Sequence, residues 1–163
     1  SISQLTNLKH LSINDNKITT LPNECFYIPN LSILNARNNL LTVLPIDIHN
    51  AIRLKYIDLS NNNLTFLPET IGLLPSLENL YLDNNNLKLL PKSIGKIKTL
   101  IILNLNDNFI KKLPKFKYYL HELSCNNNFI KVFPTSNITI LYMKNNAIKT
   151  IQFKKTNSFI KYK

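Results

Sequence analysis

The chain has 163 residues and a formal net charge of +11, from 20 Lys and Arg against 9 Asp and Glu. Its 44% hydrophobic residues are enough for one elongated folded domain with a sizeable core. No apolar run approaches the roughly 20 residues of a membrane-spanning helix, and 2 glycines are too few for a phosphate-binding glycine loop.

One pattern of apolar residues, asparagine and proline recurs along the whole chain. Its copies begin near Leu8, Leu31, Leu54, Leu77, Leu100, Leu120 and Ile138, so the step is 23 residues four times, then 20, then 18. A fixed period of this length indicates one supersecondary unit stacked on itself. We therefore predict a single domain over residues 1–163 with about seven repeats, and we expect it to be a piece of a longer protein.

Each copy contains a short stretch in which apolar and polar residues alternate, as in residues 80–83. Alternation with period two predicts a strand, and stacked copies then make a parallel sheet with one strand each. Between the longer copies, Pro68 and Pro91 are expected to occupy the first position of a short helical turn, and Gly72 and Gly95 a tight bend after it. The 20- and 18-residue copies have no room for that turn.

An asparagine follows the predicted strand in every copy. At a strand end, its amide and carbonyl can satisfy backbone groups of the turn, so the stacked side chains should form a buried, hydrogen-bonded ladder. We predict a structural role for these asparagines, which are Asn16, Asn39, Asn62, Asn85, Asn108, Asn128 and Asn146.

The resulting pattern, LxxLxLxxNxLxxLP, resembles that of leucine-rich repeat proteins. The 23-residue copies with LPxxIGxL, clearest at 67–74, resemble the Ras-group class of Scribble- and Erbin-type scaffolds, and the shorter later copies are similar to repeats of bacterial effectors and large-virus proteins. The resemblance implies an α/β fold: a right-handed solenoid, or horseshoe, with a parallel sheet on its concave face and short helical or extended segments on its convex face. It also implies a non-catalytic intracellular scaffold.

A protein partner is expected to bind the concave face, because packing fixes the inward positions and leaves the outward ones free. Tyr56 and Tyr81 lie on adjacent predicted strands within diagonal reach, and aromatic residues and Arg concentrate interface energy. The predicted partner-binding residues are Arg37, Tyr56, Asp58, Tyr81, Asp83, Asn104, Ile33, Ile102 and Tyr142. With the turn positions Asp15 and Asp107 included, this face carries five acids against two bases, although the chain is basic. The identity of the partner stays open.

Two other functions remain open at this point. The segment could be the recognition arm of an enzyme, such as a ubiquitin ligase, kinase or phosphatase, whose catalytic domain lies elsewhere. Alternatively, residues 88–163, with 15 Lys against 2 acids, could bind nucleic acid or an anionic membrane. The candidate lysines are Lys111, Lys112, Lys115, Lys117, Lys154 and Lys155.

The sequence offers no catalytic residues, and we expect no enzyme activity, metal, cofactor or small-molecule substrate. His10, His49 and His121 are not spaced as metal ligands. Cys25 and Cys125 occupy apolar positions four copies apart, so we expect no disulfide between them. This favours a cytoplasmic protein, with secretion or injection into a host cell as alternatives.

Overall fold

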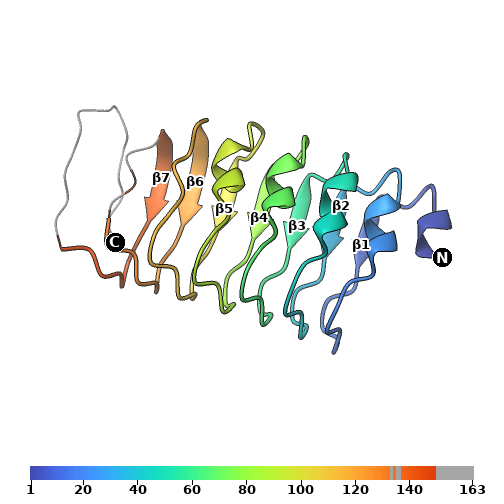
Figure 1. The fold of residues 1–163 in the computed structure, drawn as a ribbon, viewed down its shortest axis with the longest axis horizontal. Helices are drawn as coiled ribbons and strands as arrows, with labels where there is room; N and C mark the ends of the chain where they lie inside the picture. Colours follow the sequence, from blue (N-terminus) through green and yellow to red (C-terminus); the bar gives the residue numbers. More distant parts are fainter. Residues whose placement is uncertain (133, 135–136, 150–163) are drawn as a thin grey trace.

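The computed structural model describes residues 1–132, 134 and 137–149. Its 7 strands pair in chain order in one open parallel sheet (Figure 1). They are β1 (His10–Ser12), β2 (Ile33–Asn35), β3 (Tyr56–Asp58), β4 (Asn79–Tyr81), β5 (Ile102–Asn104), β6 (Leu120–Ser124) and β7 (Ile138–Tyr142). The prediction of one strand per repeat in a parallel α/β solenoid is confirmed.

Short 3-10 helices lie on the other side of the molecule from the strands (Figure 1). They are η1 (Ile2–Gln4), η2 (Asn23–Tyr27), η3 (Ile46–Asn50), η4 (Glu69–Leu73) and η5 (Lys92–Lys96). A proline precedes each of η2 to η5 with ψ between 142° and 146°. The proline is therefore the extended residue before the helix, and the prediction that it is the first helical residue is wrong. No helix forms in residues 97–119, as the 20-residue step predicts.

Gly72 and Gly95 allow the repeats to approach one another closely. Neither has a positive φ, so the predicted tight bend is wrong. A Cβ on Gly95 would lie 2.2 Å from the Lys115 carbonyl oxygen, and one on Gly72 would lie 2.6 Å from the Ser93 carbonyl carbon. Both glycines lie inside a 3-10 helix, where a side chain would collide with the backbone of the next repeat.

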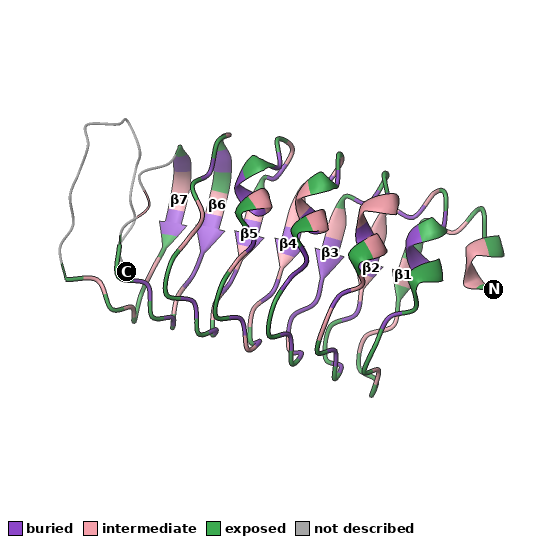
Figure 2. Ribbon diagram, viewed as in Figure 1, coloured by how far each residue is buried: buried purple, intermediate pink, exposed green. Residues whose placement is uncertain are grey.

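The core is a set of inward columns in which each leucine or isoleucine packs on its counterpart in the next repeat. Ile57, Leu80, Leu103 and Leu123 are 0% exposed. Figure 2 shows buried residues along the strands, whereas the helices carry buried, intermediate and exposed residues. Full burial of one such side chain stabilises the fold by about 1.5–3 kcal/mol. Leu11 at the N-terminal end is only half-buried, because it has a neighbouring repeat on one side alone.

The asparagines after the strands hydrogen-bond within their own repeat and to the one before it. The Asn85 amide lies 3.0 Å from the Leu59 carbonyl and 3.1 Å from the Leu82 carbonyl, and its Oδ1 accepts the Leu64 N–H at 2.9 Å. Corresponding bonds to the preceding repeat are made by Asn39, Asn62, Asn108, Asn128 and Asn146. Among the described residues, the Asn16 side chain bonds only within its own turn, and it is exposed.

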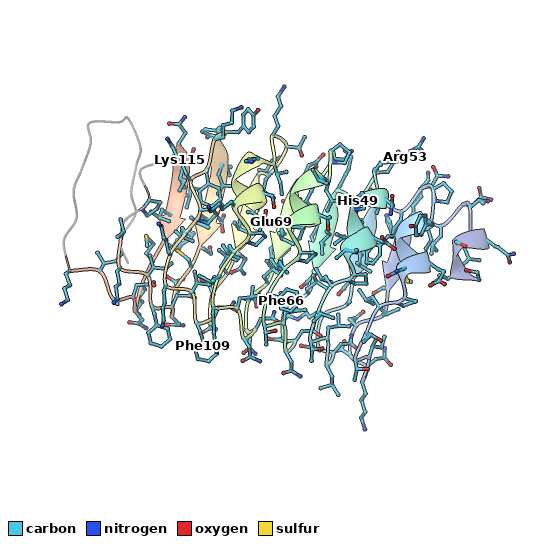
Figure 3. The ribbon with its side chains drawn as sticks, viewed as in Figure 1. His49, Arg53, Phe66, Glu69, Phe109 and Lys115 are labelled. Carbon is cyan, nitrogen blue, oxygen red and sulfur yellow. The ribbon has the colours of Figure 1, made fainter. Side chains whose placement is uncertain are left out.

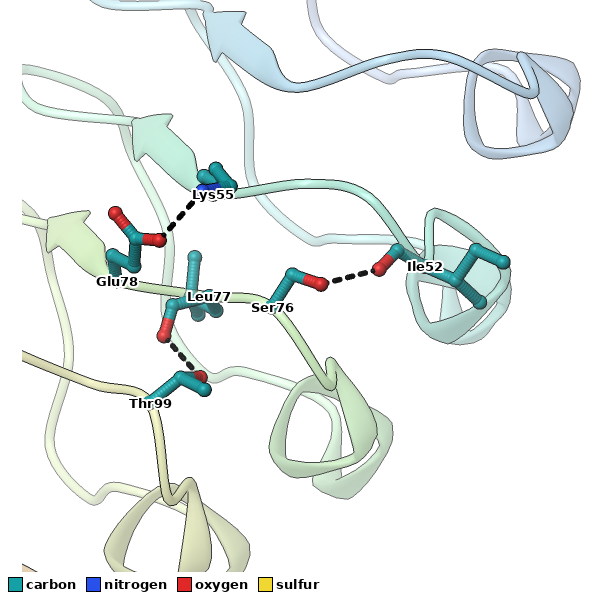
Figure 4. A network of polar contacts seen from close by, with 6 residues as sticks. All are labelled: Ile52, Lys55, Ser76, Leu77, Glu78 and Thr99. Carbon is teal, nitrogen blue, oxygen red and sulfur yellow. Dashed lines mark hydrogen bonds and ion pairs between the residues drawn. The ribbon is translucent and has the colours of Figure 1, made fainter.

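Further side-chain bonds join successive repeats between the helices and the strands. The Ser76 hydroxyl donates to the Ile52 carbonyl at 2.8 Å, and the Thr99 hydroxyl donates to the Leu77 carbonyl at 2.7 Å (Figure 4). Lys55 and Glu78 form an ion pair of 2.9 Å beside them. Because this pair is solvent-exposed it contributes little to stability, at most about 1 kcal/mol.

Candidate functional site

The side chains of the strands that point away from the leucine core form two rows across the sheet. The parallel register places Tyr56 between Ile33 and Asn79, and Tyr81 between Asp58 and Asn104. We call the surface formed by these rows the outward sheet face. The complete rows are His10, Ile33, Tyr56, Asn79, Ile102, Glu122, Ile140, and Ser12, Asn35, Asp58, Tyr81, Asn104, Ser124, Tyr142.

Tyr56 on β3 and Tyr81 on β4 are in direct contact on this face. Their ring centroids lie 5.2 Å apart with the planes tilted by 40°. Partial burial raises the pKa of Tyr56, and the nearby Asp58 carboxylate adds to this shift. Burial also raises the pKa of Tyr81, with Glu122 and Asp58 as further causes. Both hydroxyls therefore stay protonated at neutral pH and can donate a hydrogen bond to a ligand.

Asp58 is buried rather than presented on the surface, and this corrects its predicted role as a contact residue. It is 7% exposed, and its carboxylate accepts the Ser60 N–H at 2.9 Å. Asp83 is better placed for contact, since it is only half-buried. Its Oδ1 accepts the Ser60 hydroxyl at 2.6 Å and the Asn104 amide at 3.0 Å. These bonds fix the acidic edge of the tyrosine pair.

The remaining predicted contact residues do not form one cluster. Arg37 is exposed and acts electrostatically on Tyr56, so it lies beside the pair. Ile33 and Ile102 are half-buried members of the Tyr56 row, on opposite sides of it. Tyr142 on β7 is 38% exposed and three strands from Tyr81, or roughly 14 Å at the usual strand spacing. The sheet brings together Arg37, Tyr56, Tyr81, Asp83 and Asn104.

The predicted basic surface is only partly described. Lys111, Lys112, Lys115 and Lys117 are exposed, whereas Lys154 and Lys155 lie outside the described residues. Within the described part of the chain, no group of three or more His, Cys, Asp or Glu is arranged to hold a metal ion. No helix among the described residues is long and apolar enough to cross a membrane.

A second column of side chains was not predicted from the sequence. The residue before each ladder asparagine has a positive φ, as in Asn61 (55°) and Asn84 (53°), and every one is Asn or Asp, which tolerate this conformation. The Asn84 amide donates to Asn61 Oδ1 at 2.8 Å, and Asn61 donates to Asn38 at 2.6 Å. The recurrence of Asn or Asp directly before each ladder asparagine is the sequence signal that could have predicted this column.

Two exposed phenylalanines form another feature that the sequence analysis missed. The Phe109 and Phe129 rings are stacked with centroids 6.1 Å apart. Each follows a ladder asparagine, so they occupy the same position in successive repeats. Phe109 lies in the loops below the helices in Figure 3. Their shared repeat position was a signal for this contact.

Comparison with known proteins identifies the repeat. The leucine-rich repeat family models match residues 7–27 and 29–87. A leucine-rich repeat protein of Leptospira interrogans superposes with a TM-score of 0.86 and 34% identity over 93% of this chain. The chain is built of leucine-rich repeats. These matches name the leucine-rich repeat but no class within it, so the Ras-group class stays a prediction.

Other solved leucine-rich repeat structures are also similar. The leucine-rich repeat domain of a Shigella effector has 26% identity and a TM-score of 0.70 over 93% of this chain. The ectodomain of an Arabidopsis thaliana membrane receptor kinase, in complex with CASPARIAN STRIP INTEGRITY FACTOR 2, has 25% identity and a TM-score of 0.74 over 90%. The chain spans 41% of the Leptospira protein, 64% of the Shigella domain and 19% of the receptor chain. The search of curated proteins gave no match.

Leucine-rich repeat domains are in general protein-interaction modules, and the fold is typically non-catalytic. Stacked repeats create an extended binding surface without needing a deep enclosed pocket. The fold therefore supports protein binding as the general role.

Proposed function

We propose that this chain binds another protein through the outward sheet face, with Tyr56 and Tyr81 at the centre of the contact. The observation that carries the proposal is the tyrosine pair itself, two half-buried rings in contact on the outward sheet face. Large aromatic side chains bury much area at low conformational cost and are enriched among the residues that dominate binding energy. Ordered tyrosines of this kind suit a protein surface as the ligand.

The charges around the pair favour a partner with a basic side chain at the centre of its surface. Asp83 and the buried Asp58 lie on one edge, and Glu122 acts on Tyr81 from the other. Arg37 adds a single cation on the β2 side. A partner lysine or arginine could reach the Asp83 carboxylate while its stem packs on the rings.

The test is affinity capture with the full chain followed by mass spectrometry. The variant Tyr56→Ala with Tyr81→Ala should lose the partner while keeping the thermal midpoint of the wild type within a few degrees. Tyr27→Ala with Tyr119→Ala is the matched control, because both tyrosines are exposed and neither lies on the outward sheet face. Capture that survives the first variant would contradict the proposal.

A second candidate is the recognition part of an enzyme whose catalytic domain lies outside these residues. It is favoured by one observation: a similar structure is the ectodomain of a membrane receptor kinase, of which this chain spans 19%. The sequence of the full-length protein distinguishes the two candidates directly. For the repeats themselves we propose no catalytic activity, no metal or cofactor, and, since Cys25 and Cys125 are free and buried, a reducing compartment such as the cytoplasm.

A further inference from the structure

The molecule changes its construction after η5. Four successive repeats each contain a 3-10 helix of five residues, and these helices lie side by side. The next repeat has an extended segment at the corresponding place and no helix. The extended segment 115–117 packs directly on η5, where the Lys117 N–H donates to the Gly95 carbonyl at 2.7 Å. A helix is thus followed by a thin extended chain, which leaves a step on the helix side of the solenoid.

A groove of about 1010 Å³ occupies this step. Apolar side chains form part of its lining: Leu89, Leu90, Leu113, Pro114 and Phe116. Leu89 is 66% exposed and Phe116 is 6% exposed, so the apolar surface runs from the solvent to a nearly buried ring. The volume is at the upper end of the range usual for ligand sites.

Five exposed lysines line the same groove: Lys92, Lys96, Lys112, Lys115 and Lys117. Lys117 lies 5.2 Å from the centroid of the Tyr118 ring. None of the five forms an ion pair within the described part of the chain, where Lys55 and Glu78 make the one pair. Like charges around an apolar surface repel one another, and an anionic ligand relieves that repulsion.

The one carboxylate in the lining, that of Glu69, offsets one of the five lysine charges, and Lys96 acts on it electrostatically. Glu69 extends from η4 toward the start of η5, where its two oxygens accept the backbone N–H groups of Lys92 and Ser93 at 3.1 Å each. Figure 3 shows Glu69 and Lys115 on the side of the molecule that carries the helices. Counting five lysines against one carboxylate leaves the groove with a local charge of +4.

We propose that this groove is a second binding site, which takes an acidic peptide segment of a partner protein with one large apolar side chain among its carboxylates. The apolar side chain would lie against Leu89 and Leu113 while the carboxylates pair with the lysines. The site is on the opposite side of the repeats from the outward sheet face, so it does not depend on the proposed function.

Other anionic partners fit the groove less well. Nucleic acid binding of single strands relies on exposed rings for base stacking, and the aromatic side chain in the described lining, Phe116, is nearly buried. A bilayer surface is flat and would meet the lysines without reaching Phe116. Residues 151–163 carry four lysines and no acidic residue, so this segment is positively charged like the groove and does not suit it as an occupant.

The test is fluorescence anisotropy of the full chain with a short fluorescein-labelled peptide that carries one leucine between two runs of glutamate. Lys112→Glu with Lys115→Glu should weaken binding by about tenfold or more. Lys9→Glu with Lys17→Glu is the matched control, because it changes the net charge equally at exposed positions at the other end of the molecule. Equal weakening in both variants would overturn the proposal.

Two further arms test the apolar part of the site. Leu89→Ser, at an exposed position, should weaken binding several-fold without loss of thermal stability, and a peptide with serine in place of leucine should lose affinity on the wild-type chain. If the serine peptide binds equally well, the lysines alone account for binding, the apolar lining contributes nothing, and the proposal fails. The variant Tyr56→Ala with Tyr81→Ala should leave peptide binding unchanged, so failures of the two proposals are distinguishable.

The same variants separate the alternative occupants. Retention on phosphatidylserine vesicles that exceeds peptide binding and disappears in Lys112→Glu with Lys115→Glu would assign the groove to a membrane. Self-association in sedimentation velocity that the same variant abolishes would assign it to a second copy of the chain, whose outward sheet face is acidic. Either result would overturn the peptide proposal.

Discussion

Asn85 illustrates how one polar side chain can join two repeats. It is 4% exposed, and its amide and its Oδ1 together serve carbonyls of two repeats and the N–H of Leu64. A buried backbone donor that loses its acceptor costs about 1–3 kcal/mol. Each buried ladder asparagine therefore stabilises both the turn after its own strand and the contact with the preceding repeat.

We expect Asn85→Ala to lower the free energy of unfolding by about 2–4 kcal/mol, because the Leu64 N–H loses its acceptor and the amide loses its carbonyls. Urea unfolding followed by circular dichroism measures this loss. Asn16→Ala is the matched control and should cost less than about 1 kcal/mol, since the Asn16 side chain is exposed and bonds only within its own turn. Equal losses would mean that the contact between repeats contributes nothing.

Cys125 shows the effect of burial on a titratable group. Its thiol donates to the Tyr142 carbonyl at 3.3 Å, and burial raises its pKa from 9.0 to about 12. At pH 8 the thiol is therefore neutral in the folded chain, and the thiolate that alkylating reagents attack is scarce.

We expect iodoacetamide to leave Cys125 unmodified in the native chain at pH 8 and to modify it fully in urea, as mass spectrometry of tryptic peptides would show. The shift also predicts a pH dependence. From about pH 9 upward the unfolded chain loses the thiol proton while the folded chain keeps it, so the free energy of unfolding falls as the pH rises toward 12. Rapid native modification would contradict the burial.

At the scale of elements, glycine at the contact lets η4 pack closely on η5, and η5 on the segment 115–117. The equivalent positions are Phe26 in η2 and His49 in η3, so a side chain is accepted there in two repeats and excluded in the next two. In a helix, alanine is normally favoured over glycine by up to about 1 kcal/mol. Here the close backbone atoms reverse that preference.

We expect Gly95→Ala to destabilise the fold by about 1–3 kcal/mol, because the new methyl group must displace the Lys115 backbone. Thermal unfolding of this variant should be compared with that of His49→Ala, the matched control, which adds no atoms at the same position in η3. Increased stability in Gly95→Ala would show that the segment 115–117 moves away at no cost.

At the scale of the whole molecule, stability is a sum of repeats and of contacts between neighbouring repeats. Inner repeats such as that of β3 have a neighbour on both sides, and Ile57 is 0% exposed. The repeat of β1 has a strand partner on one side only, and its Leu11 is half-buried. The β1 end of this 163-residue chain should therefore open before its middle.

Hydrogen exchange measured by mass spectrometry tests this expectation. In the 163-residue chain, amides of β1 should exchange faster than those of β3 at pH 7, since local opening at an end breaks fewer contacts. Uniform protection across both strands would indicate that the whole stack unfolds as one unit.

The sequence determined the repeat, its register and its core. Spacing of 23 residues assigned each strand, and the alternation within 80–83 assigned Leu80 and Leu82 to the core and Tyr81 to the outward face, as observed. These features are periodic, and a period is visible in the chain alone because every copy meets the same neighbours.

Only the tertiary structure decided features that depend on how closely two copies approach. Asp58 is buried, Gly95 lies against Lys115, and a groove opens where a helix meets a shorter copy. Each depends on distances between residues in different copies, which the period does not specify. The repeat therefore sets which side chains face outward, and the packing of one copy on the next sets which of them a partner can reach.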